Sequence, residues 1–131
     1  MLVDLGRSDL LSVITGQLAL DTYDIGLFTS SAAIVEGDTY ASIVEASFGG
    51  YARVTTSGWL TPTGPVSGIW NSNASNVTFT NSSGSPATVY GFFFIGTSRG
   101  IFYGGDLFSS PIVIPAGGSV VITPSWFDTT A

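Results

Sequence analysis

With 131 residues, no cysteine and no histidine, the chain has the length of one domain and cannot be held together by disulfides or thiolate metal ligands. Charged residues make up only 9% of it, and three arginines against nine acids give a net charge of -6, which excludes the cationic face that nucleic acids and anionic membranes require. No apolar run approaches the roughly 18 residues of a membrane span.

The N-terminal residues 1–17 are predicted to form a short helix or an arm. Ser8 is followed by an apolar run and could accept amide hydrogen bonds at the N-cap, and Gly16 could supply the left-handed residue that ends a helix. Consecutive β-branched residues at 13–15 favour instead a first strand over residues 10–15. We keep both alternatives for this segment.

Residues 18–131 are predicted to form a single β domain, because short β-like runs alternate with turn residues. The predicted strands are residues 18–30, 51–56, 66–70 at an edge, 77–80, 87–95, 100–108, 111–114 and 119–123. Residues 31–50 read as an extended connection with a helical turn near 40–45. We expect two hairpins, 87–95 with 100–108 and 111–114 with 119–123. Short strands at this spacing predict an all-β fold, an antiparallel β-sandwich or jelly roll.

Catalytic and metal-binding chemistry finds little support in the residue types. Carboxylates at Glu36, Glu45 and Asp106 are the nominal acid–base candidates, but their spacing does not indicate a glycosidase pair. Asp21 with Asp24, or Glu36 with Asp38, could offer oxygens to calcium, yet no loop has the alternating acids of a calcium hand. We therefore expect a non-enzymatic protein with no cofactor and no metal.

Aromatic residues indicate a core together with a subunit interface. Phe92, Phe93 and Phe94 are consecutive on a predicted strand and must point to both faces of its sheet. Either both faces are covered within the domain, or another subunit covers one of them. The residues we assign to such an interface are Phe92, Phe94, Tyr103, Trp126, Arg53 and Arg99, the arginines because a guanidinium can bind a carboxylate across an interface. Alternatively, Trp59 and Trp70 could form a loop that binds a glycan or a receptor.

Several segments resemble small virion proteins of tailed bacteriophages. They are YDIGLFTSSA at 23–32, IVEASFGGYARV at 43–54, VTFTNSSGSPATVYGFFFI at 77–95 and IPAGGSVVITPSW at 114–126. In those proteins an LFT strand, an A-x-F-x-G-Y segment, a Trp and a T-V-Y-G segment recur in this order. The resemblance implies a structural role in the virion, most simply a capsid decoration or cement protein. Its expected partners are further copies of itself, with a trimer as the favoured number, and the major capsid protein or other virion proteins. A tail or head-fibre component that binds host receptor or glycan is the alternative.

Overall fold

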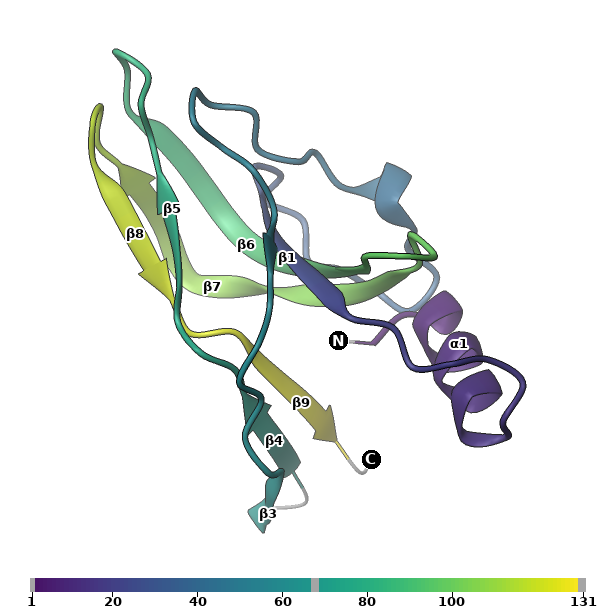
Figure 1. The fold of residues 1–131 in the computed structure, drawn as a ribbon. Helices are drawn as coiled ribbons and strands as arrows, with labels where there is room; N and C mark the ends of the chain where they lie inside the picture. Colours follow the sequence, from purple (N-terminus) through teal and green to yellow (C-terminus); the bar gives the residue numbers. More distant parts are fainter. Residues whose placement is uncertain (1, 67–68, 130–131) are drawn as a thin grey trace.

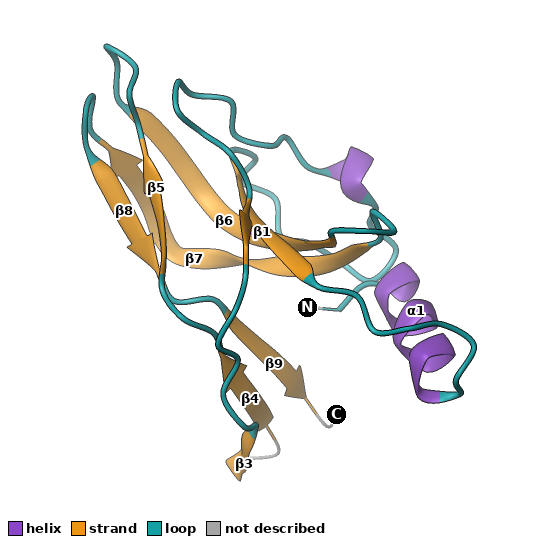
Figure 2. Ribbon diagram, viewed as in Figure 1, coloured by secondary structure: helices purple, strands orange, loops and turns teal. Residues whose placement is uncertain are grey.

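Antiparallel β-strands dominate the structure, as predicted, and a short α-helix lies near the N-terminus (Figures 1 and 2). The computed structural model describes residues 2–66 and 69–129, without the side chains of residues 65–70 and 127–129. In chain order the elements are α1 (Asp4–Ile14), β1 (Tyr23–Phe28), the 3-10 turn η1 (Tyr40–Ser42), β2 (Val54–Thr55), β3 (Thr63–Val66), β4 (Ile69–Asn73), β5 (Val77–Thr80), β6 (Ala87–Gly96), β7 (Phe102–Ile114), β8 (Ser119–Ile122) and β9 (Ser125–Thr129).

The longest strands, β6 and β7, form the predicted hairpin at the centre of the fold. They belong to a sheet with the strand order β2-β1-β6-β7. The turn between them contains Gly100 at a φ of 65°, a conformation that glycine adopts without the steric cost of a side chain. Strand β1 pairs with β6 along its whole length, from Tyr23 opposite Gly96 to Phe28 opposite Gly91. This hairpin and β1 therefore position most of the apolar side chains.

Both faces of this sheet are covered within the chain. On one face Phe94 belongs to a buried cluster with Ile25 and Leu27 of β1. On the other face Phe93 belongs to a second cluster with Phe28 of β1, and the N-terminal arm contributes the fully buried Val3. Of the two alternatives that the consecutive phenylalanines allowed, the structure shows that coverage comes from within the domain.

Glycines on neighbouring strands make room for two of these phenylalanine rings. Gly26 lies opposite Phe93 and Gly91 lies opposite Phe28 in the β1–β6 register. A Cβ atom placed on Gly26 would lie 2.4 Å from Cζ of Phe93, and one placed on Gly91 would lie 2.4 Å from Cζ of Phe28. Each ring thus lies directly over a glycine backbone, which lets aromatic side chains pack flat on the sheet.

The predicted hairpin between residues 111–114 and 119–123 is wrong. Strand β7 runs on to Ile114, and β8 pairs with β5, with Val77 opposite Ile122. In Figure 1, β5 and β8 lie side by side, next to the N-terminal half of β6 and the C-terminal half of β7. This pairing lets Phe79 and Ile122 pack in the same cluster as Val89 and Ile114, so β8 covers apolar side chains of β6 and β7.

The N-terminal segment is a helix, and the strand alternative for residues 10–15 is wrong. The helix begins at Asp4 rather than after Ser8, and Val3 occupies the N-cap without a side-chain hydrogen bond. Tertiary contacts replace the predicted cap: the amide of Val3 donates to the carbonyl of Tyr103 (2.9 Å) and that of Asp4 donates to Glu36 (2.9 Å). Gly16 follows the helix at a φ of 76°, as predicted.

Strand limits also differ from the prediction in the first half of the chain. Strand β1 starts at Tyr23 and not at residue 18, because Asp21 bends back to bind the β6–β7 turn. Strand β2 contains only Val54–Thr55, whereas the predicted turn near residues 40–45 is present as η1. The edge strand predicted at 66–70 corresponds to β3 and β4 on either side of residues 67–68, which lie outside the described residues. Strands β3, β4 and β9 form a separate sheet.

Candidate functional site

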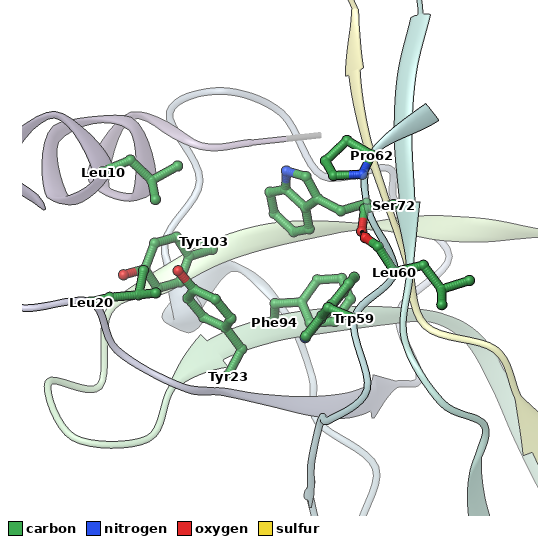
Figure 3. Close-up of a pocket in the computed structure, with 10 residues that line it drawn as sticks. Leu10, Leu20, Tyr23, Trp59, Leu60, Pro62, Ser72, Phe94 and Tyr103 are labelled. Atoms are coloured by element: carbon green, nitrogen blue, oxygen red, sulfur yellow. Dashed lines mark hydrogen bonds between the residues drawn. The ribbon is translucent and has the colours of Figure 1, made fainter. Parts of the chain in front are cut away.

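An apolar pocket of about 430 Å³ lies between α1 and the segment that leads into β3 (Figure 3). Its lining comes from segments that are far apart in the sequence and consists of Leu10, Leu20, Tyr23, Trp59, Leu60, Pro62, Ser72, Phe94, Tyr103 and Trp126. In Figure 3, Leu10 lies on the helix side, Leu60 and Pro62 lie on the opposite side, and Tyr23 and Phe94 lie between them. The volume falls in the range of about 300–1,000 Å³ that is typical of ligand pockets.

Aromatic rings form the inner wall of the pocket. Phe94 of β6 contacts Trp126 of β9 edge to face, with ring centroids 5.0 Å apart, and contacts Trp59 at 5.8 Å. Tyr23 and Tyr103 form a second edge-to-face pair at 5.0 Å. Offset and edge-to-face geometries of this kind stabilise aromatic clusters by about 0.5–1.5 kcal/mol per pair beyond the burial of their area. These contacts hold the rings of the wall against one another.

Hydrogen bonds within the protein already occupy most polar groups of the wall. The indole N–H of Trp59 donates to the Thr56 hydroxyl (3.1 Å), and the Ser72 hydroxyl donates to the carbonyl of Leu60 (2.7 Å). The Tyr103 hydroxyl donates to the Asp9 carboxylate. The pocket therefore presents few groups that could bind a polar ligand.

The rim of the pocket exposes large apolar side chains to solvent. Leu20 is 70% exposed and Leu60 is 64% exposed, although both line the pocket. On α1, whose Leu10 lines the pocket, Leu11 is 65% exposed and Ile14 is 80% exposed. We call Leu11, Ile14, Leu20 and Leu60 the apolar rim. Single exposed leucines are common on protein surfaces, but a set around one apolar pocket is typical of a binding site.

A partly buried ion pair fixes α1 beside the pocket. Arg99 in the β6–β7 turn donates from Nε to Asp9 Oδ1 (2.9 Å) and from Nη2 to Asp9 Oδ2 (2.6 Å), and its Nη1 donates to the carbonyl of Ala19 (2.8 Å). Gly6 lies so close to Tyr103 that a Cβ atom there would be 2.9 Å from its Cα. The helix is thus held to β7 by a bidentate ion pair and by close backbone packing.

The carboxylates of Asp9 and Asp21 are held in the ionised form. The hydrogen bonds from Arg99 lower the pKa of Asp9 more than burial raises it, and the Tyr103 hydroxyl lowers it further. At Asp21 burial raises the pKa, but hydrogen bonds from the backbone amides of Arg99, Ser98 and Thr22 outweigh this effect and the net pKa is lowered. Carboxyl groups with these partners are structural anions and poor proton donors at neutral pH.

A second polar cluster surrounds Glu45. Arg53 donates to it from Nε (2.9 Å) and Nη2 (2.8 Å), and the hydroxyls of Tyr51 and Tyr40 donate to it as well. Burial alone would raise the pKa of Glu45, yet these donors lower it overall. The guanidinium of Arg53 also lies 5.6 Å from the ring of Phe93, which places a cation over the edge of the second core cluster.

The residues expected at a subunit interface lie in different places. Phe94 and Tyr103 are buried, at 1% and 2% exposure, while Phe92 and Trp126 are half-buried and contact Phe94. Both arginines form ion pairs within the chain, Arg53 with Glu45 and Arg99 with Asp9. Trp59 lines the pocket, and the side chain of Trp70 lies outside the described residues. Tyr103, Phe94, Trp126 and Trp59 are therefore brought together, although sequence analysis had assigned Trp59 to a separate site.

Sequence analysis missed the leucines and the proline of this site, namely Leu10, Leu20, Leu60 and Pro62. The sequence did contain a signal for Leu10 and Leu20. Residues 10–20 have no charged side chain, and five of these eleven residues are leucine or isoleucine. A helix that faces water normally carries charges on its outer face. The uncharged residues 10–14 therefore indicated that this part of α1 contributes to an apolar surface.

The acidic residues considered for catalysis or calcium binding lie apart from one another, and Asp21 and Glu45 among them are bound in the polar clusters described above. Glu36 pairs with Arg7 (2.9 Å), Asp24 accepts from the Thr55 hydroxyl (2.7 Å) and Asp38 accepts from the Val35 amide (2.7 Å). Within residues 2–66 and 69–129, no three acidic side chains are grouped as a metal site. In the same part of the chain, no helix has the length and apolar character to cross a membrane.

Comparison with known proteins identifies no family for the chain. No protein-family model matches the sequence, and no curated protein is similar enough to count as a relative.

Proposed function

We propose that this chain is a non-enzymatic structural protein of a tailed-bacteriophage particle, a capsid decoration or cement protein that associates with further copies of itself on the shell. Its domain is a β-sandwich or jelly roll with an N-terminal helix. The observation that carries the proposal is the apolar rim, whose four side chains are exposed to water in the monomer. A partner that covers these side chains would remove this apolar surface from water. The resemblance to virion proteins supports the phage particle as the assembly to which the chain belongs.

The free energy available at the rim is large enough to matter for assembly. Burying one leucine-sized side chain completely contributes about 1.5–3 kcal/mol. The four rim residues are 64–80% exposed, so covering them would contribute about 4–8 kcal/mol. Association itself costs roughly 4–15 kcal/mol. The rim must therefore act together with the aromatic pocket to give a stable contact.

Cryo-electron microscopy of the intact particle tests this proposal. Density for the chain at many symmetric copies over the capsid lattice is the expected result. Its absence from the particle would overturn the proposal, and density only at the tail would favour the alternative below.

A tail or head-fibre component that binds a host receptor or glycan is the second candidate. Trp59 and Trp126 beside one pocket favour it, because indole rings stack on sugar faces. Sugars also need hydrogen bonds for their hydroxyl groups, and most polar groups of this pocket are already occupied. Trp59→Ala should weaken receptor or glycan binding if the candidate is right, and unchanged binding by a folded variant would refute it.

A further inference from the structure

We propose that the occupant of the pocket is helix α1 of a second copy of this chain. The inference deepens the self-association in the proposed function and rests on it. It assigns a specific contact to that association: the exposed end of α1, with Leu11 and Ile14, inserts into the pocket of a neighbouring copy and covers its rim residues Leu20 and Leu60.

The chemistry of the pocket restricts what can fill it. Trp59, Ser72 and Tyr103 already donate their protons within the chain, which leaves the Tyr23 hydroxyl and the Trp126 indole N–H as the other polar side-chain groups of the lining. An extended peptide would therefore leave most of its backbone N–H and C=O groups without partners. Burying such groups unpaired is costly. A helix satisfies its interior backbone groups, and at the end of α1 the carbonyls of Leu11, Ser12 and Val13 accept from the amides of residues 15–17 that follow the helix. This end therefore presents mainly side chains, as in other complexes that place an amphipathic helix in an apolar groove.

Helix α1 has the surface that such an occupant needs. Its charged residues, Asp4, Arg7 and Asp9, all lie in its first half, and its last turn carries no basic residue. Asp9 is bound by Arg99, and Arg7, which precedes Leu11 by four residues on the same side of the helix, pairs with Glu36 (2.9 Å). The charges of α1 nearest to Leu11 and Ile14 are therefore held in ion pairs. An uncharged apolar helix end is matched to an uncharged apolar pocket, whereas a strongly basic or acidic partner would gain nothing from this surface.

The position of the helix beside its own pocket makes the contact reciprocal. Leu10 lines the pocket, and Ile14 lies one helical turn further on the same side of the helix. A neighbour that inserts its Ile14 into the pocket therefore brings its own pocket close to the first Ile14. Such contacts close as a two-fold pair or as a head-to-tail ring, and both arrangements bury every helix end and every pocket. The mass of the oligomer distinguishes the two.

Charge substitutions on the two sides of the contact test it. We would measure the oligomer mass and dissociation constant of the purified full chain by analytical ultracentrifugation, for the wild type, Ile14→Glu, Leu60→Arg and an equimolar mixture of the two variants. Each variant alone should raise the dissociation constant at least tenfold. The mixture should associate more tightly than either variant, because the new carboxylate enters the pocket that carries the new guanidinium.

Val121→Glu is the matched control, since Val121 is 59% exposed on β8, on the side of the fold away from α1 (Figure 1). It introduces the same charge and should leave the dissociation constant unchanged. Circular dichroism should show the same fold for all variants, because each replaced side chain is largely exposed.

A second measurement keeps the test decisive if a charged variant misfolds. The native chain has no cysteine, so Ile14→Cys and Leu60→Cys can be mixed under mild oxidation. A disulfide between two chains requires Cβ atoms about 3.5–4.5 Å apart and should form in this mixture. As the control, Ile14→Cys is mixed with Val121→Cys. This mixture should form no more linked dimer than Ile14→Cys forms alone.

Two results would overturn the inference, and they separate it from the proposed function. An oligomer whose dissociation constant is unchanged in both Ile14→Glu and Leu60→Arg would refute the helix contact and leave self-association intact. A wild-type chain that stays monomeric at all concentrations would refute both the contact and self-association. The presence of the chain on the phage particle is decided independently by the density described above.

Discussion

Replacing Gly91 with alanine should destabilise the fold strongly. The added Cβ atom would lie 2.4 Å from Cζ of Phe28 and 2.3 Å from the carbonyl oxygen of Asp106. Ordinary contacts are about 1 Å longer, so both neighbours, or the β6 backbone itself, must shift to make room. Phe28 is fully buried on one side, and Asp106 belongs to the ladder of β7 on the other. Overpacking of this kind costs about 1–3 kcal/mol, and we expect the upper end because neither neighbour is a flexible side chain.

Urea unfolding monitored by tryptophan fluorescence measures this cost. A loss of about 3 kcal/mol corresponds to a decrease of roughly 10 °C in the melting temperature for a domain of this size. Gly84→Ala is the control, because nothing lies within 4 Å of a Cβ atom at that position, and it should change the unfolding free energy by less than about 0.5 kcal/mol. If Gly91→Ala were as stable as the control, the close packing of Phe28 on the β6 backbone would be refuted.

Three further predictions concern the polar contacts. Asp9→Asn removes the charge that holds Arg99, so amide hydrogen exchange in α1 should speed up at least tenfold while β6 is unaffected; equal protection of the helix would contradict the role of the ion pair. Asn81→Ala leaves the carbonyls of Ser85 and Ile114 without their buried donor, and chemical unfolding should show a loss of about 1–3 kcal/mol, with a loss near zero refuting it. The unfolding free energy should fall as the pH decreases below about 4: Asp9, Asp21 and Glu45 have lowered pKa values in the folded state, so the unfolded state binds protons first. A stability that is constant from pH 5 to pH 2 would contradict this last prediction.

The strand pairing of the core shows which features follow from the local sequence pattern and which depend on tertiary packing. Alternation of apolar residues and the glycine turn at 96–100 predicted the β6–β7 hairpin, because pairing across a short turn is a local event. The same reasoning assigned β8 to β7 across residues 115–118 and was wrong, since β8 pairs with β5. The turn residues at 115–118 do not show that β8 buries more apolar surface when it pairs with β5.

The end of α1 follows from the local sequence, whereas its start depends on tertiary contacts. Gly16 ends α1 as its residue type predicts, whereas the start at Asp4 depends on backbone hydrogen bonds to Tyr103 and Glu36, which are distant in sequence. Arg99 was expected to bind a carboxylate across a subunit interface, but it pairs with a carboxylate of its own chain. Its partner, Asp9, is 90 residues away in the chain, and only the folded structure identifies it.

The sequence by itself determined the all-β class, the central hairpin and the low charge, because these follow from residue type and from spacing along a strand. Only the tertiary structure decided which strands pair across the fold and that residues between Leu10 and Trp126 line one pocket. The physical reason is that burial depends on the sum of contacts from distant segments. A leucine at position 20 or 60 looks the same in the sequence whether it lies in a core or on the rim of a site.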